Sequence, residues 1–235
     1  KRAGFFACLL LPHKHLLRLL RFLLYFNCIF NEIMPDNSLF LQEPNFKFVQ
    51  MESTFSKYIN VNGHLLDLSV PRVMGILNVT PDSFYAGSRQ QTETDIATRA
   101  RQILDEGACI IDIGAYSSRS DARHISAAEE MSRLRTGLEI IRRNHPDAII
   151  SVDTFRADVA EMCVTEYGVA IINDIAGGEM DDQMFQTVAR LNVPYIMMHM
   201  KGTPQNMQKN PHYDNLVKEV FLYFARKVEQ LRAMG

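Results

Sequence analysis

Five times in succession, a short apolar run ends in polar residues and leads into a stretch with helical periodicity. The apolar runs cover residues 73–79, 109–113, 148–152, 170–172 and 194–198, and the helical stretches cover residues 94–106, 127–144, 157–166, 182–191 and 214–234. Near-continuous apolar strands that alternate with helices are typical of parallel sheets, because parallel strands are buried on both faces and need helical crossovers. The alternation therefore predicts an α/β fold in which helices cover a parallel sheet.

Two architectures accommodate consecutive βα units: a (β/α)8 barrel and a doubly wound open sheet. The dinucleotide-binding form of the open sheet needs a GxGxxG turn after its first strand, and residues 73–84 (VMGILNVTPDSF) contain none. Polar residues follow every predicted strand, which suits the catalytic face of a barrel. We therefore expect a fold of the TIM-barrel type over residues 51–235, with about five of the eight βα units present.

Two segments precede this alternation. Residues 58–68 (YINVNGHLLDL) place Asn62-Gly63 between two apolar runs, which predicts a hairpin with a type I′ turn that caps one end of the sheet. Residues 1–50 read as a separate, atypical extension. They are interpreted either as sequence upstream of the native start or as a membrane-associating helix, since Lys14, Arg18 and Arg21 form a basic face opposite leucines.

Composition narrows the class of protein. The 235 residues carry a net charge of -2, so there is no broad electrostatic case for nucleic-acid binding. No apolar span in residues 1–50 reaches the roughly 20 residues that a transmembrane helix needs. The cysteines form no CxxC pair, and we expect Cys109 and Cys163 to be buried, reduced thiols in a cytoplasmic protein.

Polar side chains stand at the carboxyl end of each predicted strand. They are Asn78, Asp112, Asp153, Asn173 and His199. Each could be a turn former or a helix cap when taken alone. On neighbouring strands, however, a carboxylate and two amides can read the edge of a flat heterocycle, because Asp accepts N–H donors and Asn matches one donor and one acceptor. For His199 we expect a packing or hydrogen-bonding role at the strand end.

Five motifs in this region resemble the dihydropteroate synthase family. They are residues 74–84 (MGILNVTPDSF), 112–119 (DIGAYSSR), 151–154 (SVDT), 171–175 (IINDI) and 198–200 (MHM), and the resemblance extends over residues 51–235. It implies a (β/α)8 barrel that condenses 6-hydroxymethyl-7,8-dihydropterin pyrophosphate with 4-aminobenzoate. The implied products are 7,8-dihydropteroate, a folate precursor, and pyrophosphate. The family is usually homodimeric.

The resemblance also implies roles for individual residues. Asn78 matches the residue that binds Mg²⁺ and pyrophosphate, and Mg²⁺ prefers such oxygen ligands. The residues that match substrate-binding positions are Asp112, Ser118, Asp153, Asn173 and Met198. Asp153, Asn173 and Arg119 match positions with a part in catalysis, Asp153 by stabilising positive charge on the pterin ring. The implied reaction needs no protein nucleophile, in keeping with a sequence that shows no Ser-His-Asp or Cys-His arrangement.

The sequence departs from the family pattern in two places. Ser120-Asp121 stands where the family has Pro-Gly, which adds a negative charge near the expected 4-aminobenzoate site and bears on sulfonamide binding. The chain also ends at Gly235, where the family enters its sixth strand, so we expect a truncated product. Two alternatives stay open: an inactive, truncated pterin-binding fragment, and a methyltetrahydrofolate-dependent methyltransferase domain.

Overall fold

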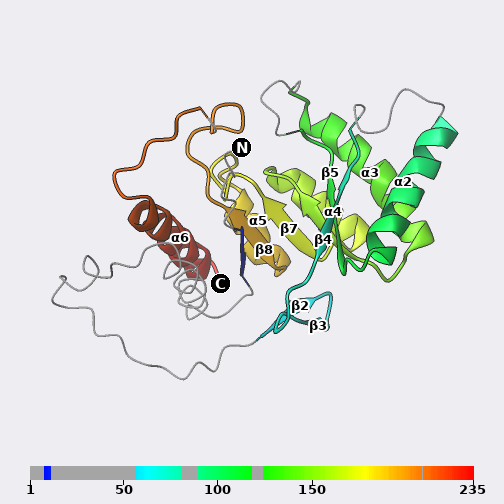
Figure 1. Cartoon of the computed structure of the whole chain (residues 1–235), viewed down its shortest axis with the longest axis horizontal. Coiled ribbons are helices and arrows are strands. Elements are labelled where there is room, and N and C mark those ends of the chain that lie inside the picture. Colours follow the sequence, from blue (N-terminus) through cyan, green and yellow to red (C-terminus); the bar gives the residue numbers. More distant parts are fainter. Residues whose placement is uncertain (1–7, 12–56, 81–88, 118–123, 208) are drawn as a thin grey trace.

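The computed structural model describes residues 8–11, 57–80, 89–117, 124–207 and 209–235 (Figure 1). Its centre is a six-stranded sheet with the strand order β1-β8-β7-β6-β5-β4. The strands are β1 (Cys8–Leu11), β4 (Met74–Asn78), β5 (Ile110–Gly114), β6 (Ile149–Asp153), β7 (Ile171–Asp174) and β8 (Tyr195–Met198). From β4 to β8 each strand pairs in parallel with the next, which confirms the predicted βα alternation and the barrel-type α/β fold.

Five helices occupy the described part of the chain. They are α2 (Arg89–Asp105), α3 (Ala127–Asn144), α4 (Ala157–Tyr167), α5 (Met184–Leu191) and α6 (Leu216–Ala233). The Ser126 hydroxyl caps α3 by accepting a hydrogen bond from the Glu129 amide at 3.2 Å, and Gly168 ends α4 with a φ of 62°. Helix α2 begins earlier than predicted. The prediction began too late because the first turns are polar and the apolar period starts only at Ile96. The other predicted bounds differ from the observed ones by no more than two residues.

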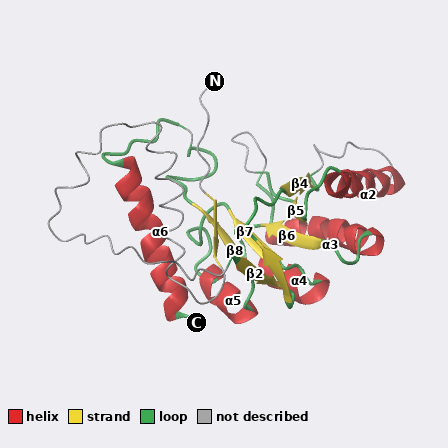
Figure 2. Ribbon diagram, turned by 60° about the horizontal axis from the view of Figure 1, so that its bottom comes forward, coloured by secondary structure: helices red, strands yellow, loops and turns green. Residues whose placement is uncertain are grey.

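One face of the sheet, called here the outer face, is covered by the helices. Leu77, Ile111, Ile113 and Val152 project from it into the main hydrophobic core together with apolar residues of α2, α3 and α4. Figure 2 shows α3, α4 and α5 side by side along this face. The core explains why the strands read as near-continuous apolar runs: their outer-face residues are buried under helices.

The predicted hairpin is confirmed. Strands β2 (Tyr58–Val61) and β3 (His64–Asp67) pair antiparallel, and both turn residues, Asn62 and Gly63, have positive φ angles of 52° and 84° as a type I′ turn requires. Ile59 and Val61 pack against apolar residues from the amino-terminal ends of the sheet strands. The hairpin therefore closes the end of the sheet opposite the polar strand ends.

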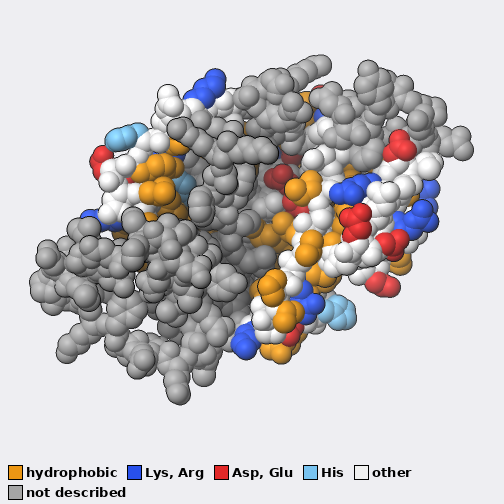
Figure 3. Space-filling view, viewed as in Figure 1, with side chains coloured by type: hydrophobic (Ala, Val, Ile, Leu, Met, Phe, Trp, Pro, Cys, Tyr) orange, Lys and Arg blue, Asp and Glu red, His pale blue; other side chains and the backbone are white. Residues whose placement is uncertain are grey.

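Exposed apolar side chains lie along the hairpin and β4. Leu65 and Val73 are exposed, and Ile76 is 59% exposed in the middle of β4. They contribute to the hydrophobic side chains visible around β4 and the hairpin in Figure 3. Among the described strands, β4 lies at one edge of the sheet and pairs with β5 alone, which accounts for the exposure of a mid-strand isoleucine.

At the opposite edge, β1 pairs antiparallel with β8, from Cys8 opposite Met198 to Leu11 opposite Tyr195. The sequence analysis expected no strand in residues 1–50. An apolar run in extended conformation can satisfy the backbone groups of an edge strand, whatever its local periodicity. The basic residues Lys14, Arg18 and Arg21 lie outside the described residues. Among the helices that are described, none combines the length and the apolar character needed to cross a membrane.

Candidate functional site

The inner face of the sheet, opposite the helices, carries a row of polar residues at the carboxyl ends of its strands. Asn78 on β4 is the partner of Gly114 on β5, Gly114 is the partner of Asp153 on β6, and Asp153 is the partner of Asn173 on β7. Partners in a parallel ladder point to the same face of a sheet. One level, called here the upper tier, is therefore formed by Asn78, Gly114, Asp153 and Asn173.

A second polar level, the lower tier, lies two residues earlier along the strands, on the same face. Asp112 on β5 and Ser151 on β6 are partners there, and both side chains are buried. The Asn173 amide donates a hydrogen bond from Nδ2 to Asp112 Oδ2 at 3.0 Å, which joins the two tiers. Ile110, one level further down, and Ile171, the partner of Ser151, pack with the hairpin and close the floor.

The lower tier is incompletely satisfied. Asp112 Oδ1 and Ser151 Oγ are buried on two partnered residues. Neither atom makes a hydrogen bond of good geometry among the described residues, although Ser151 lies close enough to Asp112 to lower its pKa. A buried polar atom without a partner costs about 1–3 kcal/mol. Such atoms are rare in folded proteins and often mark functional positions. Two of them on the inner face, beneath Gly114 and Asp153, suit a site that receives a polar ligand.

The carboxyl groups of the two tiers influence one another. Burial, followed by the negative charges of Asp112, Asp174 and Glu130, raises the pKa of Asp153 to about 8. Burial also raises the pKa of Asp112, and hydrogen bonding from Ser151 and then from Asn173 opposes that rise. An acid that holds its proton near neutral pH is expected to give it up when N–H donors or a positive charge approach. The site is thus suited to a ligand edge that is rich in N–H donors.

The rim beside the upper tier is apolar. Met198, at the end of β8, is partly buried and packs against a cluster that contains Phe155, Ala176 and Met200. His199 follows it and lies edge-on to the rings of Tyr223 and Phe224, at centroid distances of 4.8 and 6.4 Å. Burial lowers the pKa of His199, which suits the packing role expected from the sequence.

Asn78 is the candidate metal residue, and its surroundings among the described residues suit a substrate-assisted site. Its side chain is exposed, with Oδ1 directed over Gly114. The part of the chain that the structure describes contains no group of three His, Cys, Asp or Glu side chains that could hold a metal ion. Mg²⁺ commonly takes one or two protein oxygens and completes its shell with water and substrate phosphates. Asn78 fits that arrangement as a single protein ligand.

Two predicted site residues, Ser118 and Arg119, and the departures Ser120-Asp121 lie outside the described residues. The structure does describe the two residues that flank this segment closely, Tyr116 and His124. Their side chains meet, with 3.1 Å between Tyr116 Oη and His124 Nδ1. The two residues that flank the segment therefore lie close together. They lie next to Phe155, whose ring packs edge-on against Tyr116 with 5.0 Å between the ring centroids.

A buried ion pair supports this region, and the sequence analysis missed it. Glu130 of α3 is fully buried and pairs with Arg156, which follows β6. Thr154 donates a hydrogen bond from its hydroxyl to Glu130 at 2.7 Å, and the Arg156 guanidinium lies 4.8 Å from the Phe155 ring centroid. The strand end that carries Asp153 is thereby fixed to α3. No local pattern joins residues so far apart in the chain, so nothing in the sequence indicated the pair.

Asp174 was also missed, although it follows Asn173 directly. Its carboxylate is fully buried and accepts hydrogen bonds from Tyr195 Oη at 2.5 Å and from the amides of Ala176 and Gly178 at 2.7 and 2.8 Å. These contacts shape the loop after β7 and leave Asp174 no role at the inner face. The Gly177-Gly178 pair that follows was the available signal for a tight turn organised by an acidic residue.

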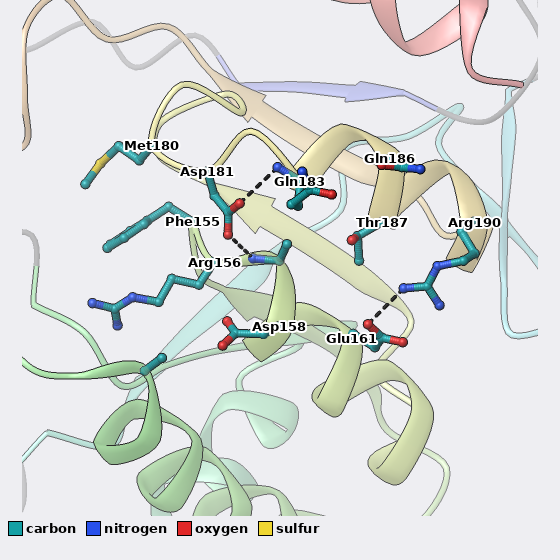
Figure 4. A pocket seen from close by; sticks show the side chains of 12 residues that line it. Phe155, Arg156, Asp158, Glu161, Met180, Asp181, Gln183, Gln186, Thr187 and Arg190 are labelled. Atoms are coloured by element: carbon teal, nitrogen blue, oxygen red, sulfur yellow. Dashed lines mark hydrogen bonds and ion pairs between the residues drawn. The ribbon is translucent and has the colours of Figure 1, made fainter.

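A separate hollow of about 650 Å³ lies outside the sheet, between the amino-terminal ends of α4 and α5 (Figure 4). Its polar groups are engaged with one another. Asp181 accepts a hydrogen bond from the Ala157 amide at 2.7 Å, and Arg190 pairs with Glu161 at 2.8 Å. Arg156 extends away from that pair in Figure 4. None of the residues that line the hollow has a buried side-chain polar atom without a hydrogen-bond partner, whereas Asp112 and Ser151 on the inner face do, so the inner-face tiers remain the better candidate site.

Comparison with known proteins shows what the chain is similar to. A family model described as "Pterin binding enzyme" matches residues 74–235, more than half of the chain. A mitochondrial folate synthesis bifunctional protein of Pisum sativum is 44% identical over 168 residues, covering 69% of this chain and 32% of its own length. Dihydropteroate synthase of Haemophilus influenzae is 39% identical over 174 residues, covering 74% of this chain and 62% of its own length.

Among solved structures, the dihydropteroate synthase of Xanthomonas albilineans with 4-aminobenzoic acid superposes with a TM-score of 0.65. It is 33% identical, and the match covers 77% of this chain and 63% of that one. The chain thus spans from about a third to about three fifths of the length of the proteins that it matches.

Proposed function

Because the chain belongs to the family of pterin binding enzymes, we propose that its inner-face tiers bind a dihydropterin and that its activity is dihydropteroate synthesis. The reaction joins 6-hydroxymethyl-7,8-dihydropterin pyrophosphate to 4-aminobenzoate, a step of folate biosynthesis. One observation carries the proposal: Asp153 and Asn173 are direct partners in the sheet, above the buried and unpartnered atoms of Asp112 and Ser151. Relatives named dihydropteroate synthase support the choice of reaction.

Recognition of the pterin follows from the donors and acceptors of the tiers. A pterin presents ring N–H and amino donors next to ring acceptors along one edge. Asp153 and Asp112 accept such donors, and the Asn173 amide can match one donor and one acceptor. Met198 lies at the apolar rim and would pack on the face of the ring. The paired tiers favour a flat, N–H-rich heterocycle over a saturated or purely anionic ligand.

The chemistry of the step needs charge stabilisation more than a nucleophile. The C–O bond between the pterin CH2 and the pyrophosphate breaks, and the leaving group takes the electron pair. The positive charge that develops on the CH2 spreads into the ring, where ionised Asp153 stabilises it. The amine of 4-aminobenzoate attacks the CH2 and then loses a proton, so that a C–N bond replaces the C–O bond.

The pyrophosphate end of the substrate would lie toward Asn78. Asn78 would hold Mg²⁺ together with the substrate's own oxygens. When bound, this ion neutralises negative charge on the leaving group. Ser118 and Arg119 are proposed to bind the pyrophosphate or the carboxylate of 4-aminobenzoate, as a hydroxyl and a guanidinium can. Ser120-Asp121 would then place a negative charge near that carboxylate and alter the affinity for 4-aminobenzoate and its sulfonamide mimics.

Calorimetry on the full chain tests the proposal. The titrant is the dihydropterin pyrophosphate, with and without Mg²⁺, against the wild type, Asp153→Asn and Asp158→Asn. Asp158 is the matched control, because it is an exposed carboxylate on α4 only five positions further along the chain. We expect Mg²⁺-dependent binding by the wild type and Asp158→Asn, and none by Asp153→Asn. Absence of binding by a folded wild type, or equal binding by all three proteins, would refute the assignment.

A second assay separates synthesis from binding alone. The same proteins are incubated with both substrates, and 7,8-dihydropteroate is measured by chromatography. Product that depends on Asp153 supports the synthase. Binding without product would instead support a pterin-binding chain that lacks the complete machinery of its relatives.

Location and assembly are proposed separately from the site. Cysteine usage favours the cytoplasm, although two relatives are named as mitochondrial. A fluorescent fusion viewed in the source cells decides between these compartments. The family is usually homodimeric, and sedimentation of the purified chain at several concentrations determines whether this chain also forms dimers.

A further inference from the structure

Gly114 occupies a special position in the upper tier, between Asn78 and Asp153. A Cβ atom added to Gly114 would lie 3.3 Å from Asn78 Oδ1, 3.4 Å from Asp153 Cβ and 3.5 Å from Asp153 Oδ2. The side chains of the two neighbours therefore converge over this residue. The missing side chain of Gly114 leaves a space that an amide oxygen borders on one side and a carboxyl group on the other.

The backbone does not require glycine at this position. Gly114 ends strand β5, and it is absent from the residues with positive φ in the described chain, so an L-residue could adopt its conformation. A glycine inside a strand weakens it, because it has no side chain to pack and more freedom to lose. Gly114 is therefore expected to lower the local stability of β5 at the point where the side chains of Asn78 and Asp153 converge.

Two other glycines show what a packing role looks like. A Cβ at Gly75 would lie 2.3 Å from Ile103 Cγ2, and one at Gly137 would lie 2.7 Å from Ile113 Cδ1. Both positions bring a helix and the outer face of the sheet close together, and both are crowded by apolar side chains. Gly114 differs from them because its nearest neighbours are polar and belong to the candidate site.

We propose that Gly114 is a specificity-determining residue, which keeps open the passage between the heterocycle held at Asp153 and Asn173 and the anionic group at Asn78. This inference rests on the proposed function. The CH2 that carries the pyrophosphate must run from Asp153 toward Asn78, and Gly114 is the residue between them in the ladder. A methyl group there would fill the passage and would meet Asp153 only at ordinary van der Waals distances, 3.4 Å from Cβ and 3.5 Å from Oδ2.

The proposal is tested with Gly114→Ala in the full chain, titrated with two ligands. One is 6-hydroxymethylpterin, which presents the ring with a short substituent, and the other is the dihydropterin pyrophosphate with Mg²⁺. We expect the pyrophosphate ester to bind about tenfold more weakly than to the wild type, since a misplaced methyl group in a filled site is costly. Binding of 6-hydroxymethylpterin should stay within about threefold. Thermal unfolding should show Gly114→Ala to be as stable as the wild type or more stable.

Gly75→Ala is the matched control, because it adds the same methyl group to a glycine on the outer face. It should lower the melting temperature and leave the ratio of the two affinities unchanged. Equal weakening of both ligands by Gly114→Ala, no weakening of either, or failure of this variant to fold would overturn the inference. A folded wild type that binds neither ligand would overturn the proposed function, and this inference with it.

Discussion

The two faces of the sheet differ in what covers them and in what they carry. The outer face presents Leu77, Ile113 and Val152 to helices, and these side chains are almost completely buried. The inner face presents polar side chains instead. Asn78 and Asp153 lie in the upper tier, and Asp112 and Ser151 lie in the lower tier. A single strand thus serves both purposes, because its side chains alternate between the faces.

The comparison shows how stability and binding can share one sheet. Apolar burial against the helices supplies the folding free energy, at about 25 cal/mol per Å² of apolar surface removed from water. The inner face offsets part of that free energy, because acids with raised pKa values and buried atoms without partners destabilise the folded state. Changes on the outer side should therefore unfold the protein, whereas changes on the inner side should alter binding and pH dependence.

The largest effect is expected from the charge buried on the helix-covered side. Glu130→Gln would leave the Arg156 guanidinium without its carboxylate partner in a largely buried position. Breaking a buried ion pair from one side destabilises proteins by about 3–5 kcal/mol. Urea unfolding followed by circular dichroism would measure the loss.

Glu129→Gln is the control for this measurement. Glu129 is the neighbouring residue and forms an exposed pair with Arg133 at 2.5 Å. Pairs of this kind contribute less than about 1 kcal/mol. Similar free energies of unfolding for the two variants would contradict the view that Glu130 is a structural charge.

The next effect in size concerns the outer face itself. Leu77 is 1% exposed and lies in the main core. Leu77→Ala removes its side chain and leaves a cavity, so the free energy of unfolding should fall by about 2–5 kcal/mol. The same unfolding experiment measures this change. A loss below about 1 kcal/mol would mean that the helices do not seal this face.

The sequence predicted the elements of both faces but not all of their connections. Apolar periodicity located the strands, and the strand ends identified Asn78, Asp153 and Asn173 as neighbours before any register was known. Strand β1 was not predicted, because edge pairing depends on backbone groups that leave no mark on the pattern. The roles inferred for Ser118 and Arg119 stay predictions, since both residues lie outside the described part of the chain.

The pair of Glu130 with Arg156 shows the main limit of the sequence analysis. The two residues are brought together by the packing of α3 beside β6, and each alone reads as an ordinary surface charge. Ser151 was likewise inconspicuous within the SVDT motif. Only the parallel register shows that it lies beneath the site, opposite Asp112. Long-range partners of this kind follow from tertiary packing, which single-sequence patterns do not encode.

A smaller effect should appear as a pH dependence of the inner face. The pKa of Asp153 is about 8 in the folded protein against an ordinary value of 3.8, so the folded state binds more protons between those values. Stability should therefore be highest below about pH 4 with respect to this group, and should fall as the pH rises toward 8. Asp112, whose pKa is also raised, contributes with the same sign.

Asp153→Asn isolates this contribution. Denaturant unfolding at a series of pH values should give a flatter dependence on pH for the variant than for the wild type, with the largest difference near the upper end of the window. Parallel curves would mean that Asp153 is not held in its protonated form. The Asp158→Asn protein again serves as the control, and its curve should follow that of the wild type.

The smallest effect is expected one residue before Leu77, at Ile76. The two side chains are sequence neighbours on β4, but Ile76 points to the inner face and is 59% exposed, at the same level as the buried Asp112. Substitution at a site so open to solvent usually changes stability by less than about 0.5 kcal/mol. Ile76→Ala should therefore be nearly neutral in urea unfolding while Leu77→Ala is not, although both remove apolar carbons from the same strand. A loss at Ile76 as large as that at Leu77 would instead show that another surface covers the inner face at β4 in solution, and sedimentation of the wild type and Ile76→Ala would then reveal whether a second copy of the chain provides it.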